Sequence, residues 1–243
     1  MRSERKNIFG SKNTCAAVIP AAGNSSRMKG MNKLIYELDG VAVTAHTLMK
    51  FENCAAIDEI VIATRPDMFD EIADMCKEYS ISKVSSIVAG GATRTESVIA
   101  GVRAVGKNIK YIAVHDAARP FVSEDIILKT LEAAIKTGAA APAVPVKDTI
   151  KRAVGSIVVD TPKREELFAV QTPQIFDREL LLGALGNAVE NNIPITDDCS
   201  AVEAIGMSVF LTEGDYSNIK ITTPEDFVLA KAILDGQKKG EKQ

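Results

Sequence analysis

The loop after the first predicted strand has residue types suited to binding phosphate. Residues 20–28 read P-A-A-G-N-S-S-R-M, and Lys33 follows shortly afterwards. Small residues let the backbone approach a ligand closely, and successive N–H groups can form a cradle for an anion. Arg27 and Lys33 add positive charge, so the loop suits a triphosphate. The pattern is neither that of a P-loop nor that of a dinucleotide fold. A flexible turn with two solvated cations is the alternative.

A second group of reactive residue types follows another predicted strand, where residues 115–120 read H-D-A-A-R-P. A carboxylate such as Asp116 at a strand's carboxyl end can bind Mg²⁺ or a substrate hydroxyl. The alternative is a turn in which Asp116 and Arg119 pair locally. We interpret His115 as a structural hydrogen-bonding group rather than a catalytic base.

Two further segments add backbone and charge to the same chemistry. Residues 90–98 read G-G-A-T-R-T-E-S-V at a strand end and a helix start, where bare backbone can contact a base and the helix terminus favours anions. Residues 218–222 read N-I-K-I-T and place Lys220 on a predicted late strand, as a point charge for phosphates. The alternatives are an ordinary capped helix and a solvated lysine at a strand edge.

The elements that must position these residues alternate between strand and helix. Apolar runs predict strands at 15–20, 59–64, 84–88, 111–114 and 140–146, with helices at 43–51, 66–79, 93–105 and 123–136. Continuously apolar strands are buried on both faces, and the alternation indicates a parallel sheet. We therefore predict an α/β fold with three layers, α/β/α, and a mostly parallel sheet. Ligands of such sheets bind beyond the carboxyl ends of the strands, where the motifs fall.

The alternation stops at about residues 146–170. Segments 149–151 and 156–160 alternate polar and apolar residues around Gly155, which predicts an antiparallel β-arm leaving the sheet. An arm of this size is too small to have a hydrophobic core of its own. We therefore expect it to pack on another part of the assembly, such as a partner subunit. Helices are predicted at 177–190, 200–205 and 223–234, and strands at 208–211 and 218–221.

Composition limits the possible classes of protein. The chain has 243 residues and a net charge of −3, so no bulk attraction to nucleic acid or to anionic membrane is expected. We expect a flexible leader at 1–13, one domain at 14–236 and a tail at 237–243. The four cysteines form no C-x-x-C pair, and two histidines exclude a histidine-rich metal site. With no signal peptide or membrane-spanning run, we expect a cytoplasmic protein.

Together, the motifs resemble those of the 2-C-methyl-D-erythritol 4-phosphate cytidylyltransferases, a family of the non-mevalonate isoprenoid pathway. The resemblance runs from Ala16 to about Leu234 and includes P-A-A-G…R-M…K, G-G-x-x-R-x-x-S-V, H-D-A-A-R-P, D-T-x-K, Q-T-P-Q, T-D-D-x-S and N-I-K. P-A-A-G and H-D-A-A-R look like this family rather than its sibling, the D-ribitol 5-phosphate cytidylyltransferases. The loop departs from the family pattern at Ser25 and Asn32 and is one residue shorter.

The resemblance implies a Rossmann-like nucleotidyltransferase fold and transfer of CMP from CTP to a polyol phosphate, with Mg²⁺ or another divalent cation. It also implies a homodimer with shared active sites, the arm providing the contacts. The alternatives are the ribitol enzyme, a transferase for another nucleotide and an inactive nucleotide-binding regulator.

The resemblance also assigns residues to roles. The implied catalytic residues are Arg27, Lys33, Lys220 and Asp116. The implied nucleotide-binding residues are Pro20, Ala21, Ala22, Gly23, Gly90 and Ser97. The implied substrate-binding residues are Asp116, Arg119, Thr149, Lys151, Arg164, Thr172, Thr196 and Asp197. Asp116 is also the candidate metal ligand, although most metal contacts are expected from the CTP phosphates.

Overall fold

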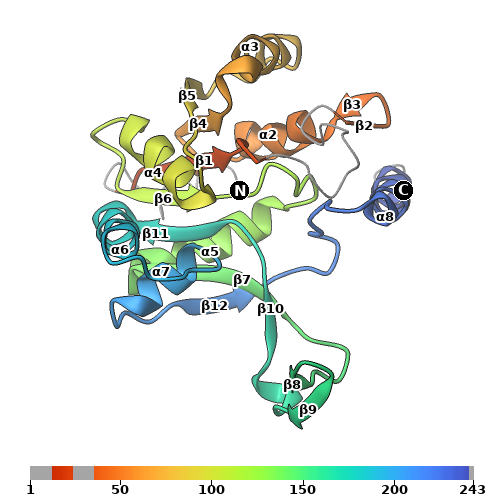
Figure 1. Cartoon of the computed structure of the whole chain (residues 1–243). Helices are drawn as coiled ribbons and strands as arrows, with labels where there is room; N and C mark the ends of the chain where they lie inside the picture. Colours follow the sequence, from red (N-terminus) through yellow and green to blue (C-terminus); the bar gives the residue numbers. More distant parts are fainter. Residues whose placement is uncertain (1–12, 24–35, 241–243) are drawn as a thin grey trace.

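The structure is a computed structural model that describes residues 13–23 and 36–240. Its central sheet has eight strands, ordered β10-β7-β11-β6-β1-β4-β5, with β12 paired to β7 (Figure 1). The strands are β1 (Cys15–Pro20), β4 (Glu59–Thr64), β5 (Val84–Ala89), β6 (Tyr111–Val114), β7 (Ala139–Pro145), β10 (Phe168–Val170), β11 (Gln174–Asp177) and β12 (Phe210–Glu213). Strands β1, β4, β5 and β6 are parallel neighbours, which places their carboxyl ends at one edge.

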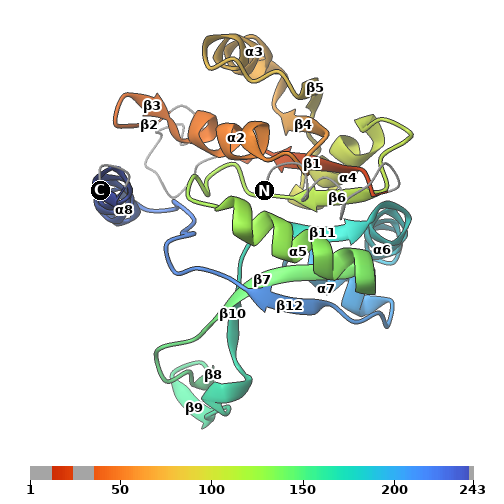
Figure 2. The same cartoon turned by 180° about the vertical axis from the view of Figure 1, so that it is seen from behind.

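Helices cover both faces of this sheet. Alternate residues of β1 show why: Ala17 and Ile19 face one apolar cluster, whereas Ala16 and Val18 face the other. The first cluster includes α2 (Val43–Asn53), α3 (Phe69–Glu78) and α5 (Glu124–Thr137). The second includes α4 (Arg94–Ala104), α6 (Arg178–Glu190) and α7 (Asp198–Ala204). Figure 2 shows α5 and α2 on the opposite face from α4 and α6, so the predicted three-layer fold is confirmed.

Two antiparallel strands were absent from the prediction. Strand β11 pairs antiparallel with both β6 and β7, and β10 continues along β7. A further small sheet joins β2 (Glu37–Leu38) to β3 (Val41–Ala42). Strands this short carry too little periodicity to be recognised from sequence, and β11 is defined by its two neighbours.

Some predicted boundaries were wrong. The first arm strand is β8 (Arg152–Val154) and not 149–151, because Val154 pairs with Ile157 across a tight turn at Gly155. Gly155 has φ of 58°, as such turns require. Residues 218–221 form a loop and no strand. Strand β12 begins at Phe210 rather than at 208, and helix α8 (Pro224–Gly240) runs past 234 into the predicted tail.

The β-arm projects from the body of the molecule beyond β7 and β10 (Figure 1). Its hairpin of β8 and β9 (Ile157–Asp160) exposes apolar side chains, with Val154 at 73% and Ile157 at 76% exposure. Single 3₁₀ turns occur at η2 (Pro66–Met68) and η3 (Arg164–Glu166). Among the described residues, no helix combines the length and the apolar character needed to cross a bilayer.

Candidate active site

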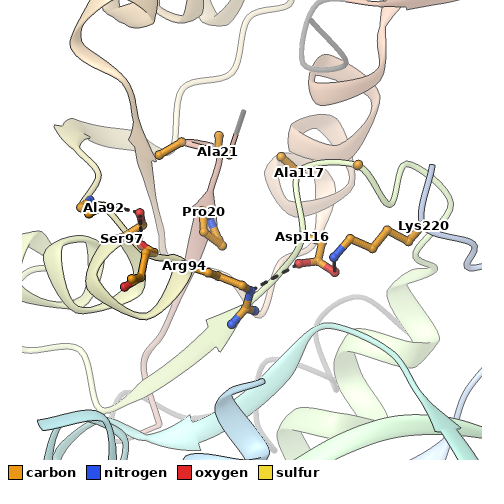
Figure 3. Close-up of a pocket in the computed structure, with 13 residues that line it drawn as sticks. Pro20, Ala21, Ala92, Arg94, Ser97, Asp116, Ala117 and Lys220 are labelled. Carbon is orange, nitrogen blue, oxygen red and sulfur yellow. Dashed lines mark hydrogen bonds and ion pairs between the residues drawn. The ribbon is translucent and has the colours of Figure 1, made fainter. Parts of the chain in front are cut away.

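A pocket of about 220 Å³ lies at the carboxyl ends of the parallel strands. Backbone hydrogen bonds hold the loops together there: the N–H of Ala21 donates to Ala63 O at 2.7 Å, and that of Gly90 to Thr64 O at 2.8 Å. Small and charged residues from four loops and from the start of α4 line the pocket (Figure 3): Pro20, Ala21, Ala22, Gly23, Gly91, Ala92, Thr93, Arg94, Ser97, Asp116, Ala117, Ala118 and Lys220. The four motifs that supply these residues therefore form one site.

Asp116 carries the central negative charge of this pocket and is surrounded by three cations. Its Oδ2 lies 3.0 Å from Lys220 Nζ, and its Oδ1 lies 3.8 Å from Arg94 Nε (Figure 3). The same Oδ2 lies 3.4 Å from Arg119 Nε. Burial alone raises the pKa of Asp116, but Lys220, Arg94 and Arg119 outweigh burial and lower that pKa to about 2. The carboxylate is thus ionised at neutral pH.

The loop of Lys220 is fastened to the loop of Asp116. Arg119 Nη1 donates to the carbonyl of Asn218 at 2.7 Å, and Ile221 N donates to Ala118 O at 2.9 Å. These bonds hold Lys220 at the pocket on a loop, although the sequence predicted a strand there. The Lys220 side chain is 36% exposed, which leaves its ammonium accessible to a ligand.

His115 supports the Asp116 loop from within the core. Its Nε2 faces the carbonyl of Arg119 at 3.2 Å, so Nε2 carries the proton and donates. Its Nδ1 lies 3.0 Å from Thr172 Oγ1, and that hydroxyl also accepts from the N–H of Asp116 at 3.1 Å. The Thr172 hydroxyl therefore donates to Nδ1. Burial lowers the pKa of His115 to about 4, which agrees with a neutral structural role.

We expect this buried neutral histidine to make stability depend on pH. In the unfolded chain the pKa is about 6.5, so protons favour unfolding as pH falls from about 7 toward 4. The free energy of unfolding should drop by roughly 2 kcal/mol between pH 7 and pH 5. Urea titrations at both values measure this drop. The His115→Gln variant, which cannot titrate, should lose most of it, and an equal drop in the variant would contradict the assignment.

The side of the pocket formed by Ala22 and Ser97, where the nucleotide is expected, depends on close packing around Gly90. Ser97 Oγ accepts from the N–H of Gly91 at 3.1 Å and donates to Thr93 O at 2.9 Å. Thr93 and Glu96 form a capping box that starts α4. A Cβ at Gly90 would lie 2.5 Å from Ala22 Cβ and 2.8 Å from Ser97 Oγ. Gly90 does not line the pocket itself; it lets Ala22 and Ser97 approach each other.

The Gly90→Ala substitution should therefore weaken nucleotide binding. Ala22 Cβ is fixed to the backbone, so the loop must move, and we expect the Kd for CTP to rise about tenfold. Titration calorimetry with CTP measures the change. Gly183→Ala is the matched control, because a Cβ at Gly183 on α6 meets nothing within 4 Å. Unchanged CTP affinity in Gly90→Ala would show that this contact does not shape the site.

The remaining predicted residues lie elsewhere or outside the described residues. Arg27 and Lys33 fall in the undescribed segment 24–35. Thr149, Lys151 and Arg164 lie on the arm, where Arg164 Nη2 donates to Thr149 Oγ1 at 3.3 Å and Lys151 Nζ donates to Thr161 Oγ1 at 2.7 Å. None of these three lines the pocket.

Thr196 and Asp197 precede α7 and also lie outside the pocket lining. Asp197 caps that helix through the N–H of Ser200 at 2.9 Å and accepts from Gln174 Nε2 at 2.7 Å. In this structure Asp197 has a capping role, and substrate contacts by Thr196 and Asp197 remain a prediction.

Sequence reasoning missed two charged residues of the site. Arg94 lines the pocket, and its Nη2 lies 2.8 Å from Oδ2 of the buried Asp198. Both residues stand in motifs quoted above, Arg94 in G-G-x-x-R-x-x-S-V and Asp198 as the second acid of T-D-D-x-S. The sequence does not show that Arg94 of the first motif pairs with Asp198 of the second, because only the fold brings these two motifs together.

The fold has three layers, and its pocket at the strand ends combines small residues, one carboxylate and several cations. This combination defines the class of α/β nucleotidyltransferases. The model of the family described as IspD, 2-C-methyl-D-erythritol 4-phosphate cytidylyltransferase, matches residues 15–236. The chain belongs to this family.

Individual relatives agree with that assignment. A protein with the family's name from Halalkalibacterium halodurans is 47% identical over 220 residues, covering 90% of this chain and 96% of the relative. One from Clostridium novyi is 46% identical over 231 residues, covering 94% and 99%. The crystal structure of 4-diphosphocytidyl-2C-methyl-D-erythritol synthase from Anaerococcus prevotii matches with a TM-score of 0.84 at 33% identity, covering 94% and 99%. The resemblance inferred from the motifs is thereby confirmed.

Proposed function

We propose that this enzyme transfers CMP from CTP to 2-C-methyl-D-erythritol 4-phosphate, giving 4-diphosphocytidyl-2-C-methyl-D-erythritol and pyrophosphate. Family membership over residues 15–236 supports the reaction. The observation that carries it in this chain is the convergence of Ala22, Ser97, Asp116 and Lys220 on one pocket. The relatives reported above bear the erythritol name, so the D-ribitol 5-phosphate alternative is not favoured.

The chemistry requires positioning and charge neutralisation more than a base. A phosphate oxygen of the acceptor attacks the α-phosphorus of CTP in line, and the bond from that phosphorus to the bridging oxygen breaks as pyrophosphate leaves. The attacking phosphate is already anionic, so no proton must be removed. Lys220 stabilises charge on the reacting phosphates, together with Arg27 and Lys33. Asp116 holds Lys220 in place and accepts from a substrate hydroxyl.

In this proposal, the divalent cation is bound mainly by the phosphates of the nucleotide. Asp116 already faces Lys220, Arg94 and Arg119, and no group of three His, Cys, Asp or Glu side chains suited to a metal occurs in the described residues. The pocket thus fits Mg²⁺ that enters bound to the CTP phosphates, with Asp116 as at most one protein ligand. Such a cation would neutralise the leaving pyrophosphate.

We propose a homodimer in which the arm completes the partner's active site. The arm exposes an apolar surface made of Val154, Ile157, Val158, Phe168 and Val170, which a second subunit would cover. Thr149 and Arg164 would then contact the acceptor phosphate across the interface. All four cysteines are buried free thiols, which supports a reducing, cytoplasmic location.

The deciding experiment measures pyrophosphate release with Mg²⁺ while CTP, UTP, ATP and GTP are crossed against the two polyol phosphates. We expect turnover only with CTP and 2-C-methyl-D-erythritol 4-phosphate. Turnover with D-ribitol 5-phosphate instead would assign the sibling activity. Turnover with a different nucleotide would overturn the assigned donor. Folded protein that releases no pyrophosphate with any pair would favour a nucleotide-binding regulator.

A further inference from the structure

Arg94 and Asp198 form an ion pair that links the pocket to helix α7. Arg94 Nη2 lies 2.8 Å from Asp198 Oδ2, while Arg94 Nε lies 3.8 Å from Asp116 Oδ1. Asp198 has no exposed surface, and neither of its carboxylate oxygens has a hydrogen bond of good geometry among the described residues. The guanidinium is therefore shared between two carboxylates, one deep in the core and one in the pocket.

Local helix stability does not explain this arrangement. Arg94 is the first residue of α4, where the helix dipole disfavours a cation. Asp198 stands in the first turn of α7, where the helix dipole favours an acid, but Asp197 already caps that helix by accepting from the N–H of Ser200. A buried carboxylate is costly to keep in a core, and burial raises the pKa of Asp198 against the opposing effect of Arg94. The stabilisation that a helix dipole gives to an acid is smaller than the penalty for burying a carboxylate, so the dipole of α7 does not account for the pair.

The position of Arg94 indicates its use. Figure 3 shows its guanidinium between Ser97, on the nucleoside side, and Asp116, which holds Lys220. That is where the phosphate attached to the nucleoside would lie. We propose that Arg94 is a further phosphate-contacting cation of this active site and that Asp198 is the positioning residue that aims it, an inference that rests on the function proposed above.

Asp198 is suited to aim a side chain because it is itself rigidly held. The N–H groups of Asp198 and Cys199 donate to Gln174 Oε1 at 3.1 and 3.2 Å, which ties α7 to strand β11. Without the Asp198 charge, Asp116 would be the nearest carboxylate to the guanidinium. Arg94 would then close on Asp116 and compete with Lys220 instead of facing the substrate.

The test combines activity and stability for Arg94→Met, Asp198→Asn and the double variant. Arg94→Met should lower kcat about 100-fold, as expected for loss of one preorganised donor. Asp198→Asn should lower kcat about tenfold, with the KM for CTP changed less than about threefold, because the cation remains but is misdirected. Matched controls are Arg103→Met on the exposed face of α4 and Glu203→Gln on that of α7, which should leave kcat unchanged.

The double variant separates positioning from structure. Arg94→Met leaves a buried charge unpaired and should lower the urea midpoint, whereas adding Asp198→Asn should restore it. If Asp198 acts through Arg94, the double variant keeps the low kcat of Arg94→Met within about twofold. Recovery of kcat together with stability would make the pair purely structural. A further tenfold loss would show that Asp198 acts independently of Arg94.

Wild-type protein run in parallel separates this inference from the proposed reaction. No wild-type turnover would refute the proposed function but would not decide the role of Arg94. Calorimetry with CTP then decides it, because Arg94→Met removes the cation and should weaken CTP binding severalfold, whereas Asp198→Asn keeps the cation and should change the affinity less. Unchanged CTP affinity in Arg94→Met would overturn the inference.

Discussion

The Lys220→Met variant should lose about 10²- to 10³-fold in kcat while remaining folded, since removing one preorganised charge from a reacting oxygen costs that much. Lys220 Nζ lies 3.0 Å from Asp116 Oδ2 and is the most exposed of the three cations at that carboxylate. Arg94 and Arg119 remain beside Asp116 and continue to lower its pKa, so the carboxylate keeps two of its three cationic neighbours. Steady-state pyrophosphate release with CTP and the erythritol phosphate measures the loss.

A matched control for this substitution is Lys136→Met, at an exposed position in the last turn of α5. It removes the same charge far from the pocket lining and should change kcat by less than twofold. If Lys220→Met raised KM and left kcat intact, Lys220 would bind substrate and transition state equally. That result would contradict its catalytic assignment while leaving its place in the pocket unchanged.

Three strands of the parallel part, β1, β4 and β6, were predictable because their central residues are apolar. Strands β1, β4 and β6 have the bounds expected from sequence. Their residues pack on helices on both faces, so no polar position interrupts the run. By contrast, β11 has only Ile175 and Phe176 between polar ends, and its pairing with β6 and β7 is a tertiary effect. No local pattern records which strands will flank such a segment.

Those residues of the candidate site that directly follow a predicted strand could be predicted from sequence. Ala22, Ser97 and Asp116 follow strands whose ends meet, so the sheet brings them together. Lys220 reaches the pocket although the strand predicted at 218–221 is a loop. Hydrogen bonds of this loop to Arg119 and Ala118 hold it in place of sheet pairing. The pair of Arg94 with Asp198 joins motifs more than a hundred residues apart in sequence. Spacing alone could not reveal it.

If the arm contributes to the partner's pocket, activity should be recovered when two inactive variants are mixed. Arg164 lies on the arm, and Lys220 lies in the pocket. If each arm serves the partner's pocket, a mixed dimer of Lys220→Met and Arg164→Ala has one site with both changes and one intact site. Equal amounts that reassociate at random give half mixed dimers, so activity should return to about a quarter of wild type.

The control for this recovery is a mixture of Lys220→Met with Asp116→Asn. Both changes lie in the pocket, so every site of the mixed dimer carries one of them and activity should stay low. The measurement is pyrophosphate release after the two chains are unfolded and refolded together, with differently tagged chains used to confirm that mixed dimers form. Mixed dimers without recovered activity would mean that the arm serves the pocket of its own chain. A monomer of full activity in sedimentation would remove the shared site altogether, and the exposed apolar surface of Val154 and Ile157 would then need another partner.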